Sequence, residues 1–311
     1  MKKEIRHIVI AGAGLMGASI GQSFPEYGIR TTIYSNRERD FMRAKAIIEN
    51  CQKTLVEAGI LTKKKSDEIQ QAIYYTTDLQ CVRDADWVIE AVPEDLEIKS
   101  EILSGIASNV SKDAIITSNT SAISIETLSN FITNPERFCG THYLNPPHII
   151  PLVEITRGEK TAQETVDTIY DFLSAMNKQP VILKKDVKGF LSNRLQFALL
   201  REATYLVESG VATPEDIDKT LKYGNGLRYL CSGPFKIVDF GGIEVFNSVA
   251  KYLYPDLNCE GEKNHLLEEM KEKGYNGTSN QLGFYSYTEE SARAEERERD
   301  KKMLLALKEM E

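Results

Sequence analysis

A glycine-rich turn near the N-terminus constrains the fold of this chain more than any other feature of its sequence. The β-branched run His7–Ala11 is typical of a buried parallel strand, and Gly12-Ala-Gly-Leu-Met-Gly17 follows it at once, before a helical pattern. In such a turn Gly12 permits the tight bend, Gly14 lets a pyrophosphate approach the backbone, and Gly17 lets the helix pack on the strand. The start of the helix then directs its amides and positive dipole end at the phosphates. The sequence therefore predicts a dinucleotide-binding unit.

Alternating strand-like and helix-like segments occupy the rest of the first 185 residues. This alternation is the pattern of a parallel sheet covered by helices on both faces. The segment from Arg39 to Gln71 predicts an inserted helical hairpin, with a break at Ala58-Gly59 and a basic loop at Thr62–Ser66. The other expected strands are Arg30–Ser35, Trp87–Val92, Ala114–Ser118, Phe138–His142, Pro151–Thr156 and Pro180–Leu183, and the expected helices are Leu96–Ala107 and Ala162–Met176.

The composition changes at Lys184–Gly189, and beyond this segment the pattern is almost entirely helical. The first helix, Phe190–Glu208, is apolar on nearly all faces, so we expect it to be buried in a core or against a partner subunit. Further helices are expected to start at Thr213 and Gly233, and the last is the charged segment Glu289–Met310. The predicted architecture is an α/β Rossmann domain over residues 1–185, with a mostly parallel, doubly wound sheet and a helical insertion, followed by an all-α domain over residues 186–311.

Composition excludes several classes of function. A formal net charge of −8 argues against general binding of nucleic acids or anionic membranes. We find no apolar run of membrane-spanning length and no signal peptide. The five cysteines are scattered without Cys-x-x-Cys spacing, which indicates free thiols and not a zinc site or a disulfide framework. We therefore expect a cytoplasmic protein that acts on a small molecule.

A histidine and a glutamate lie on either side of a proline-rich corner in Gly140–Glu154. Apolar residues on both sides of the corner predict short strands, and the prolines between them prevent a helix. A strand–corner–strand arrangement returns the chain so that Glu154 faces His142. A carboxylate against an imidazole fixes its tautomer and raises its basicity, as a general base requires near neutral pH. By themselves, these residues are equally consistent with a buried structural histidine and a solvated strand end.

The end of the second predicted strand bears on the choice of dinucleotide. An NAD-binding fold usually has an acidic residue there for the adenosine ribose, whereas this chain has Ser35, Asn36 and Arg37. Without that carboxylate nothing repels a 2′-phosphate, and Arg37 is able to pair with one, which favours NADP. An exposed turn in an NAD-dependent protein is the equally weighted alternative. The residues assigned to the glycine turn of the cofactor site are Gly12, Gly14, Leu15, Met16 and Gly17.

Several motifs in a fixed order give the chain a resemblance to the L-3-hydroxyacyl-CoA dehydrogenase family. The resemblance covers nearly the whole chain and implies the two-domain fold above, a homodimer formed through the helical domain, and a place in fatty acid metabolism. The motifs are Gly12-x-Gly-x-x-Gly17, Ser118-Asn-Thr-Ser121, Gly140-Thr-His-Tyr-Leu-Asn-Pro146, Pro151-Leu-Val-Glu154 and Gly189-Phe-Leu-Ser-Asn-Arg-Leu195, with Gly233–Asp239 and Gly283–Tyr287 further along.

The resemblance also implies roles for individual residues. His142 would take the proton from the C3 hydroxyl as hydride leaves C3 for the nicotinamide, and Glu154 would orient and charge-balance the imidazole. Ser121 and Asn193 would hydrogen-bond the substrate oxygen. Such hydride transfer needs a positioned base and a fixed cofactor, and we expect no metal. The other residues expected beside the cofactor are Glu94, Lys99, Asn119 and Asn145, of which Asn145 also contacts the substrate.

Departures from the family pattern leave the substrate open. The chain has Tyr143-Leu144 where enzymes acting on CoA thioesters typically have a phenylalanine pair, and it has an arginine in Gly224–Tyr229. These features resemble the branch containing L-gulonate 3-dehydrogenase and carnitine dehydrogenase, which act on small free 3-hydroxy acids. Arg228 could grip a free carboxylate through two hydrogen bonds, or it could form an ion pair with Glu208 or Asp239.

Three functions therefore stay open from the sequence. The first is NAD(P)-dependent oxidation of an L-3-hydroxy acid or its acyl-CoA ester to the 3-oxo compound. The alternative narrows the substrate to a small free 3-hydroxy acid, although the motifs near the C-terminus look more like the acyl-CoA branch. The last is a cofactor-binding structural protein without activity, and the intact set of predicted catalytic residues argues against it.

Overall fold

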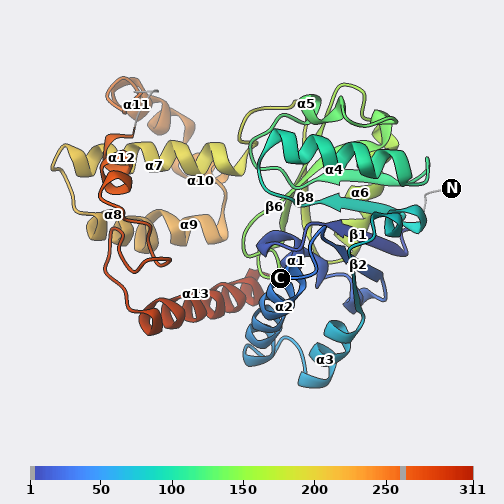
Figure 1. The fold of residues 1–311 in the computed structure, drawn as a ribbon. Coiled ribbons are helices and arrows are strands. Elements are labelled where there is room, and N and C mark those ends of the chain that lie inside the picture. The colour runs from blue at the N-terminus through green and yellow to red at the C-terminus, as the bar shows by residue number, and fades with distance from the viewer. Residues whose placement is uncertain (1–3, 260–263, 311) are drawn as a thin grey trace. The chain divides into compact units, whose positions relative to one another are not determined.

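The computed structural model describes residues 4–259 and 264–310 (Figure 1). The chain divides into two compact units, Met1–Arg194 and Leu195–Glu311. The first unit is built of strands and helices, and the described part of the second is built of helices and short bridges around Leu282. The predicted fold class is therefore confirmed. The domain boundary after residue 185 stays a prediction.

One eight-stranded sheet forms the centre of the first unit, in the order β3-β2-β1-β4-β5-β6-β7-β8. All neighbouring strands are parallel except β6 and β7, which are antiparallel. The order reverses at β1, between β2 and β4, and this is the place where doubly wound sheets bind dinucleotides. The strands are β1 (His7–Ala11), β2 (Arg30–Tyr34), β3 (Ile73–Thr76), β4 (Trp87–Glu90), β5 (Ile115–Ser118), β6 (Phe138–Tyr143), β7 (Leu152–Arg157) and β8 (Gln179–Leu183).

Helices cover both faces of this sheet, because its central strands are apolar on both sides. Ile8 and Ile10 of β1 pack on one face, whereas Val9 and Ala11 pack on the other, as the two-residue period of a strand requires. Helices α1, α2 and α6 bury apolar residues on the first face, and α4 and α5 do so on the second. The α-helices of this unit are α1 (Leu15–Gly21), α2 (Asp40–Glu57), α3 (Lys63–Gln71), α4 (Leu96–Asn109), α5 (Ile125–Ser129) and α6 (Gln163–Ala175), with short 3-10 turns at Pro25–Tyr27, Leu79–Asp84 and Pro135–Arg137.

Two local predictions in this unit were wrong. The basic segment Thr62–Ser66 is not a loop: the Thr62 hydroxyl accepts a hydrogen bond from the Lys65 amide and caps α3, so the lysines form the first turn of that helix. Strand β3 was missed, because its four residues follow a helix without a glycine or proline between them. The other predicted strands and helices are present with shifts of a few residues at their ends.

The second unit leaves much of its apolar surface exposed. The first long helix, α7 (Ser192–Glu208), does not lie in a core, because only its Thr204 is buried and Leu195 and Phe197 are exposed. Burial against a partner subunit, the other expectation for this helix, stays a prediction. Phe235 is 85% exposed and Phe240 78% exposed in the following helices. Those helices are α8 (Pro214–Thr220), the π-helix Leu221–Asn225, α9 (Gly226–Cys231), α10 (Pro234–Gly241), α11 (Ile243–Leu253), α12 (His265–Glu272) and α13 (Glu289–Met310).

Within the described residues, no helix combines the length and the apolar character needed to cross a membrane. None of the five cysteines, all of which lie in the described ranges, forms a disulfide.

Candidate active site

The glycine turn has the shape that a dinucleotide requires. Gly12 has a φ of 132°, and a Cβ on it would lie 2.5 Å from the carbonyl oxygen of Ala91. A Cβ on Gly17 would lie 1.9 Å from the carbonyl oxygen of Gly12, so helix α1 packs directly on the turn. By contrast, apart from Gly14 itself and its two chain neighbours, nothing lies within 4 Å of a Cβ placed on Gly14. The turn is closed at its two ends and open at Gly14, which fits the close approach of a pyrophosphate. Leu15 and Met16 form the first turn of α1, and Leu15 is exposed.

The antiparallel pairing of β6 and β7 brings His142 and Glu154 together. The two residues are directly opposite each other in the register, and the imidazole Nδ1 lies 2.7 Å from Glu154 Oε2. His142 is 5% exposed and Glu154 is fully buried, so Glu154 is not a solvated strand end. No described residue forms a hydrogen bond with His142 Nε2. With Nδ1–H donated to the carboxylate, Nε2 has a lone pair available for a substrate proton.

The second oxygen of the Glu154 carboxylate is held by backbone amides. The Leu191 and Ser192 amides donate to Oε1 at 2.9 and 2.8 Å. Burial opposes ionisation of Glu154, but the hydrogen bonds from His142 and from these two amides outweigh it and hold the pKa of the carboxyl below its ordinary value. Phe190 packs its ring 5.4 Å from the imidazole. The dyad is therefore an oriented histidine on an ionised, buried carboxylate.

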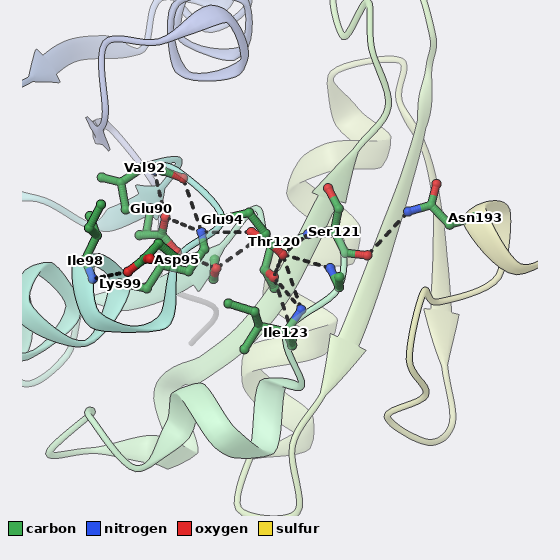
Figure 2. Close-up of polar contacts among 12 residues, drawn as sticks. Glu90, Val92, Glu94, Asp95, Ile98, Lys99, Thr120, Ser121, Ile123 and Asn193 are labelled. Carbon is green, nitrogen blue, oxygen red and sulfur yellow. Dashed lines mark hydrogen bonds and ion pairs between the residues drawn. The ribbon is translucent and has the colours of Figure 1, made fainter. Parts of the chain in front are cut away.

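Ser121 and Asn193 are joined by a hydrogen bond from Asn193 Nδ2 to the Ser121 carbonyl oxygen at 3.3 Å (Figure 2). Asn193 directly follows Ser192, whose amide binds Glu154. Ser121 lies just after β5, and β5 is the parallel neighbour of β6, which carries His142. One short segment thus links the predicted dyad to the predicted substrate-binding serine at the carboxyl edge of the sheet. No described residue forms a hydrogen bond with the Ser121 hydroxyl.

The loop that carries Ser121 is held by Glu94 (Figure 2). Glu94 Oε1 accepts hydrogen bonds from the amides of Ser121, Ala122 and Ile123 at 3.0, 2.9 and 3.3 Å, and from the Thr120 hydroxyl. Burial opposes the charge on Glu94, but the Thr120 hydrogen bond, the Lys99 charge and these amides outweigh it and lower the pKa of the carboxyl. Glu94, whose side chain is 37% exposed, therefore acts on this loop as an anionic anchor.

A buried ion pair between Lys99 and Glu90 lies next to Glu94. Lys99 Nζ lies 2.7 Å from Glu90 Oε1 and 3.4 Å from Glu94 Oε2, and Lys99 is only 1% exposed. Glu90 is fully buried at the end of β4 and accepts hydrogen bonds from Ser118 Oγ and the Val92 amide. The Lys99 ammonium thus pairs with the carboxylates of both Glu90 and Glu94. Its predicted contact with the cofactor stays a prediction.

Two amide residues predicted to lie beside the cofactor have different surroundings. Asn119 is buried, and its Oδ1 accepts a hydrogen bond from the Tyr143 amide at 2.8 Å, which ties the ends of β5 and β6 together. Asn145 is exposed and precedes a cis peptide bond to Pro146. Its side chain is available to a ligand, whereas the Oδ1 of Asn119 is already engaged.

Arg228 belongs to the second unit. It is exposed on α9, directly after the π-helix, and forms no salt bridge with Glu208 or Asp239, all three of which lie in the described ranges. The ion-pair alternative for Arg228 was therefore wrong.

Comparison with known proteins identifies the family of this chain. Residues 7–187 match the family model of the NAD-binding domain of 3-hydroxyacyl-CoA dehydrogenase, and residues 189–287 match that of its C-terminal domain. The chain belongs to the 3-hydroxyacyl-CoA dehydrogenase family. It is therefore an NAD-dependent oxidoreductase that acts on a CH–OH group.

Two relatives and one solved structure show which named activities occur among proteins similar to this chain. The chain is 36% identical to 5-formyl-3-hydroxy-2-methylpyridine 4-carboxylate 5-dehydrogenase of Mesorhizobium japonicum, with 96% of each chain covered. It is 33% identical to a probable 3-hydroxybutyryl-CoA dehydrogenase of Deinococcus radiodurans, over 89% of this chain and 99% of the relative. A crystal structure of a 5-formyl-3-hydroxy-2-methylpyridine 4-carboxylic acid 5-dehydrogenase, described as an NAD⁺-dependent dismutase, superposes with a TM-score of 0.92 at 35% identity and covers 99% of each chain.

Reasoning from the sequence missed Glu90 and Thr120 in this dehydrogenase site. Glu90 is the last residue of a buried strand, where a carboxylate is rare unless it is paired, and this was an available signal. The role of Thr120 had no such signal, because a threonine in a loop is common. Within the described residues, no group of three or more His, Cys, Asp or Glu side chains is arranged to hold a metal ion.

Proposed function

We propose that His142 is the general base of this dehydrogenase. Its Nε2 takes the proton from the hydroxyl on the reacting carbon, while the hydride on that carbon leaves with its electron pair. The imidazolium that results is stabilised by the ionised Glu154, which lies 2.7 Å from Nδ1. Bound NAD supplies the acceptor for the hydride. The observation that carries this proposal is the buried His142–Glu154 pair with Nε2 left for the substrate.

Ser121 and Asn193 complete the proposed site on the substrate oxygen. The Ser121 hydroxyl is exposed and has no hydrogen-bond partner among the described residues, so it is able to donate to the oxygen as a carbonyl forms. Asn193 Nδ2 has a second hydrogen in addition to the one that the Ser121 carbonyl accepts. Glu154 binds the neighbouring Ser192 amide, so the backbone that carries Asn193 is fixed relative to the dyad.

We propose that the substrate is a small free acid and not a CoA thioester. The similarity to a dehydrogenase named for a pyridine carboxylate supports this choice, because it extends over 99% of both chains. The exposed Arg228 supports it further, because a guanidinium binds a carboxylate through two hydrogen bonds and a thioester presents no charge there. A hydrated aldehyde belongs to the same class of substrates as a 3-hydroxy acid, since both have a C–H and an O–H on the reacting carbon.

An acyl-CoA ester is the second candidate. It is favoured by the relative named as a probable 3-hydroxybutyryl-CoA dehydrogenase, which is similar over 89% of this chain. This candidate would also place the enzyme in fatty acid metabolism.

A panel of substrates separates the two candidates. Each compound would be tested with NAD and with NADP, and formation of the reduced nucleotide would be followed by its absorbance at 340 nm. The compounds are small 3-hydroxy acids, aromatic formyl carboxylates and the matching acyl-CoA esters. We expect turnover of free acids, and we expect Arg228→Met to raise KM for the best of them by about tenfold or more, since a charge-assisted hydrogen bond is lost. Lys236→Met, which removes an exposed cation of α10, is the matched control. Turnover of acyl-CoA esters alone, or an unchanged KM in Arg228→Met, would contradict the free-acid proposal.

The assembly and location of the enzyme are also proposals. A homodimer formed by the helical unit is supported by its exposed apolar side chains. A cytoplasmic location and the absence of a metal requirement stay predictions from the sequence, which leaves the use of NADP beside NAD open.

A further inference from the structure

The end of β2 carries a carboxylate that the sequence pattern does not reveal. Ser35 occupies the position where NAD-binding sheets usually have an acidic residue. Its hydroxyl donates a hydrogen bond to Asp40 Oδ2 at 2.8 Å, and Asp40 is the first residue of α2, five positions further along. Ser35 is only 7% exposed, whereas Asp40 is half-buried. The negative charge is therefore present at this edge of the sheet, although it comes from a different residue.

This carboxylate lies on the adenosine side of the glycine turn. The Gly12 amide donates to the Tyr34 carbonyl oxygen at 2.9 Å, so the first glycine of the turn adjoins the last residue of β2. A pyrophosphate at the open Gly14 brings the adenosine ribose over the end of this strand, as in other folds of this type. Ser35 and Asp40 thus border the position of the ribose hydroxyls.

The hydrogen bonds around Ser35 assign different roles to the two residues. The single proton of the Ser35 hydroxyl is donated to Asp40, and the same oxygen accepts from the Arg37 amide at 3.3 Å. Ser35 therefore has no proton left for a ligand. Asp40 uses Oδ2 for Ser35, and no described residue forms a hydrogen bond with its Oδ1. That oxygen is free to accept a hydrogen bond from a ribose hydroxyl.

We propose that Asp40, held in place by Ser35, selects NAD over NADP in this chain. Asp40 accepts a hydrogen bond from the adenosine ribose of NAD, and the same carboxylate repels a 2′-phosphate at close range. Ser35 is a positioning residue that acts through Asp40. Arg37 is exposed and forms no salt bridge with Asp40, so the carboxylate has no cation bound to it.

Binding titrations test this inference without any substrate. The dissociation constants of NADH and NADPH would be measured by nucleotide fluorescence for the wild type, Asp40→Asn, Ser35→Ala and the control Arg37→Gln. We expect the wild type to bind NADH at least about tenfold more tightly than NADPH, and Asp40→Asn to reduce this preference by about tenfold or more. Ser35→Ala should reduce the preference by a smaller factor, because Asp40 stays charged but loses its orientation.

The outcomes are decisive even if the proposed substrate class is wrong, because no turnover is measured. An Asp40→Asn protein with an unchanged NADH-to-NADPH ratio overturns the inference. A wild type that prefers NADPH, and loses that preference in Arg37→Gln, also overturns it and supports the NADP interpretation of Ser35-Asn36-Arg37. Thermal melting of each variant without nucleotide checks that it is folded, and Asp40→Glu should restore part of the preference if the charge itself matters.

Discussion

His142 and Glu154 illustrate how much of this site depends on the ionisation state of one carboxylate. Glu154 is fully buried and has His142 on one oxygen and two amides on the other. An ionised carboxylate in such a place fixes the imidazole tautomer and balances the positive charge that forms during oxidation. Replacing Glu154 by the isosteric glutamine removes the charge and leaves the shape.

Glu154→Gln is therefore expected to lower kcat by about 100-fold or more, because the imidazolium loses its counter-charge and the tautomer is no longer fixed. The affinity for NADH, measured by fluorescence titration, should change by less than about twofold, since Glu154 forms its hydrogen bonds with His142 and the amides of Leu191 and Ser192 and not with the glycine turn. Glu159→Gln, an exposed glutamate after β7, is the matched control. Near-normal kcat in Glu154→Gln would remove the dyad from the mechanism.

Tyr143 presents an unexpected feature at the neighbouring position. Its hydroxyl is buried, and no described residue forms a hydrogen bond with it. Burial also raises the pKa of this phenol far above its ordinary value, so it stays protonated. A buried hydroxyl without a partner carries a desolvation cost of about 1–3 kcal/mol.

We expect Tyr143→Phe to stabilise the protein by about 1 kcal/mol, or about 2–4 °C in Tm, with no loss of activity. Tyr27→Phe is the informative control, because the Tyr27 hydroxyl donates to the Met176 carbonyl oxygen at 3.0 Å and its removal should lower Tm. Differential scanning calorimetry of both variants measures whether Tm rises in Tyr143→Phe and falls in Tyr27→Phe. A lower Tm in Tyr143→Phe would show that its hydroxyl has a partner in solution.

At the scale of elements, the loop between β5 and α5 owes its conformation to Glu94, which precedes α4. Three consecutive amides and one hydroxyl of this loop converge on a single carboxylate oxygen. Without that anion the amides of Ser121, Ala122 and Ile123 would turn to water, and Ser121 would lose its fixed position.

Glu94→Ala should therefore accelerate hydrogen exchange of these three amides by about tenfold or more and lower kcat/KM. Glu97→Ala, an exposed residue in the first turn of α4, should change neither quantity. Exchange followed by mass spectrometry on peptides covering residues 119–124 gives the measurement. Equal exchange rates in the two variants would contradict the role of Glu94 as the anchor of the loop.

The pH dependence of this anchor has a definite sign. Because the pKa of Glu94 is lowered in the folded protein, its stabilising effect is complete above the ordinary value of 4.5 and is lost as pH falls through the lower folded value. The difference in Tm between the wild type and Glu94→Gln should thus stay constant from pH 7 to about pH 5 and shrink below pH 4.5. Glu154 is present in both proteins, so its own titration cancels in the difference. A difference that grows toward acid pH would contradict this sign.

At the scale of the whole molecule, the two units differ in how far their apolar side chains are exposed. The first unit buries its apolar residues on both faces of one sheet. The second unit exposes Phe235, Phe240 and Ile243, at 85%, 78% and 68%. Apolar surface of this extent is typical of a protein interface.

We expect Phe240→Asp to convert a dimer into a monomer, because a charge in a dehydrated interface is costly. Light scattering coupled to gel filtration would report half the mass of the wild type. Met42→Asp, in which an 80% exposed methionine of α2 is replaced, should leave the mass unchanged. A wild type that is already monomeric would contradict the homodimer.

The sequence by itself determined the class of fold and the two-unit organisation, and together with the family motifs it predicted that His142 and Glu154 face each other. Local rules were sufficient for these features, because glycine spacing, strand alternation and a proline corner act over a few neighbouring residues. The glycine turn, the strand ends and the family motifs required no knowledge of distant contacts.

Only the tertiary structure decided which polar groups became partners. Asp40 was one more acidic residue at a helix start until Ser35 was seen to donate to it, and only the structure shows that three loop amides donate to Glu94, whose place beside the cofactor stays a prediction. The physical reason is the short range of the hydrogen bond, which depends on positions within a few tenths of an ångström. Sequence spacing does not specify such positions between segments that are far apart in the chain, whereas the packing of β4, β5 and α4 does.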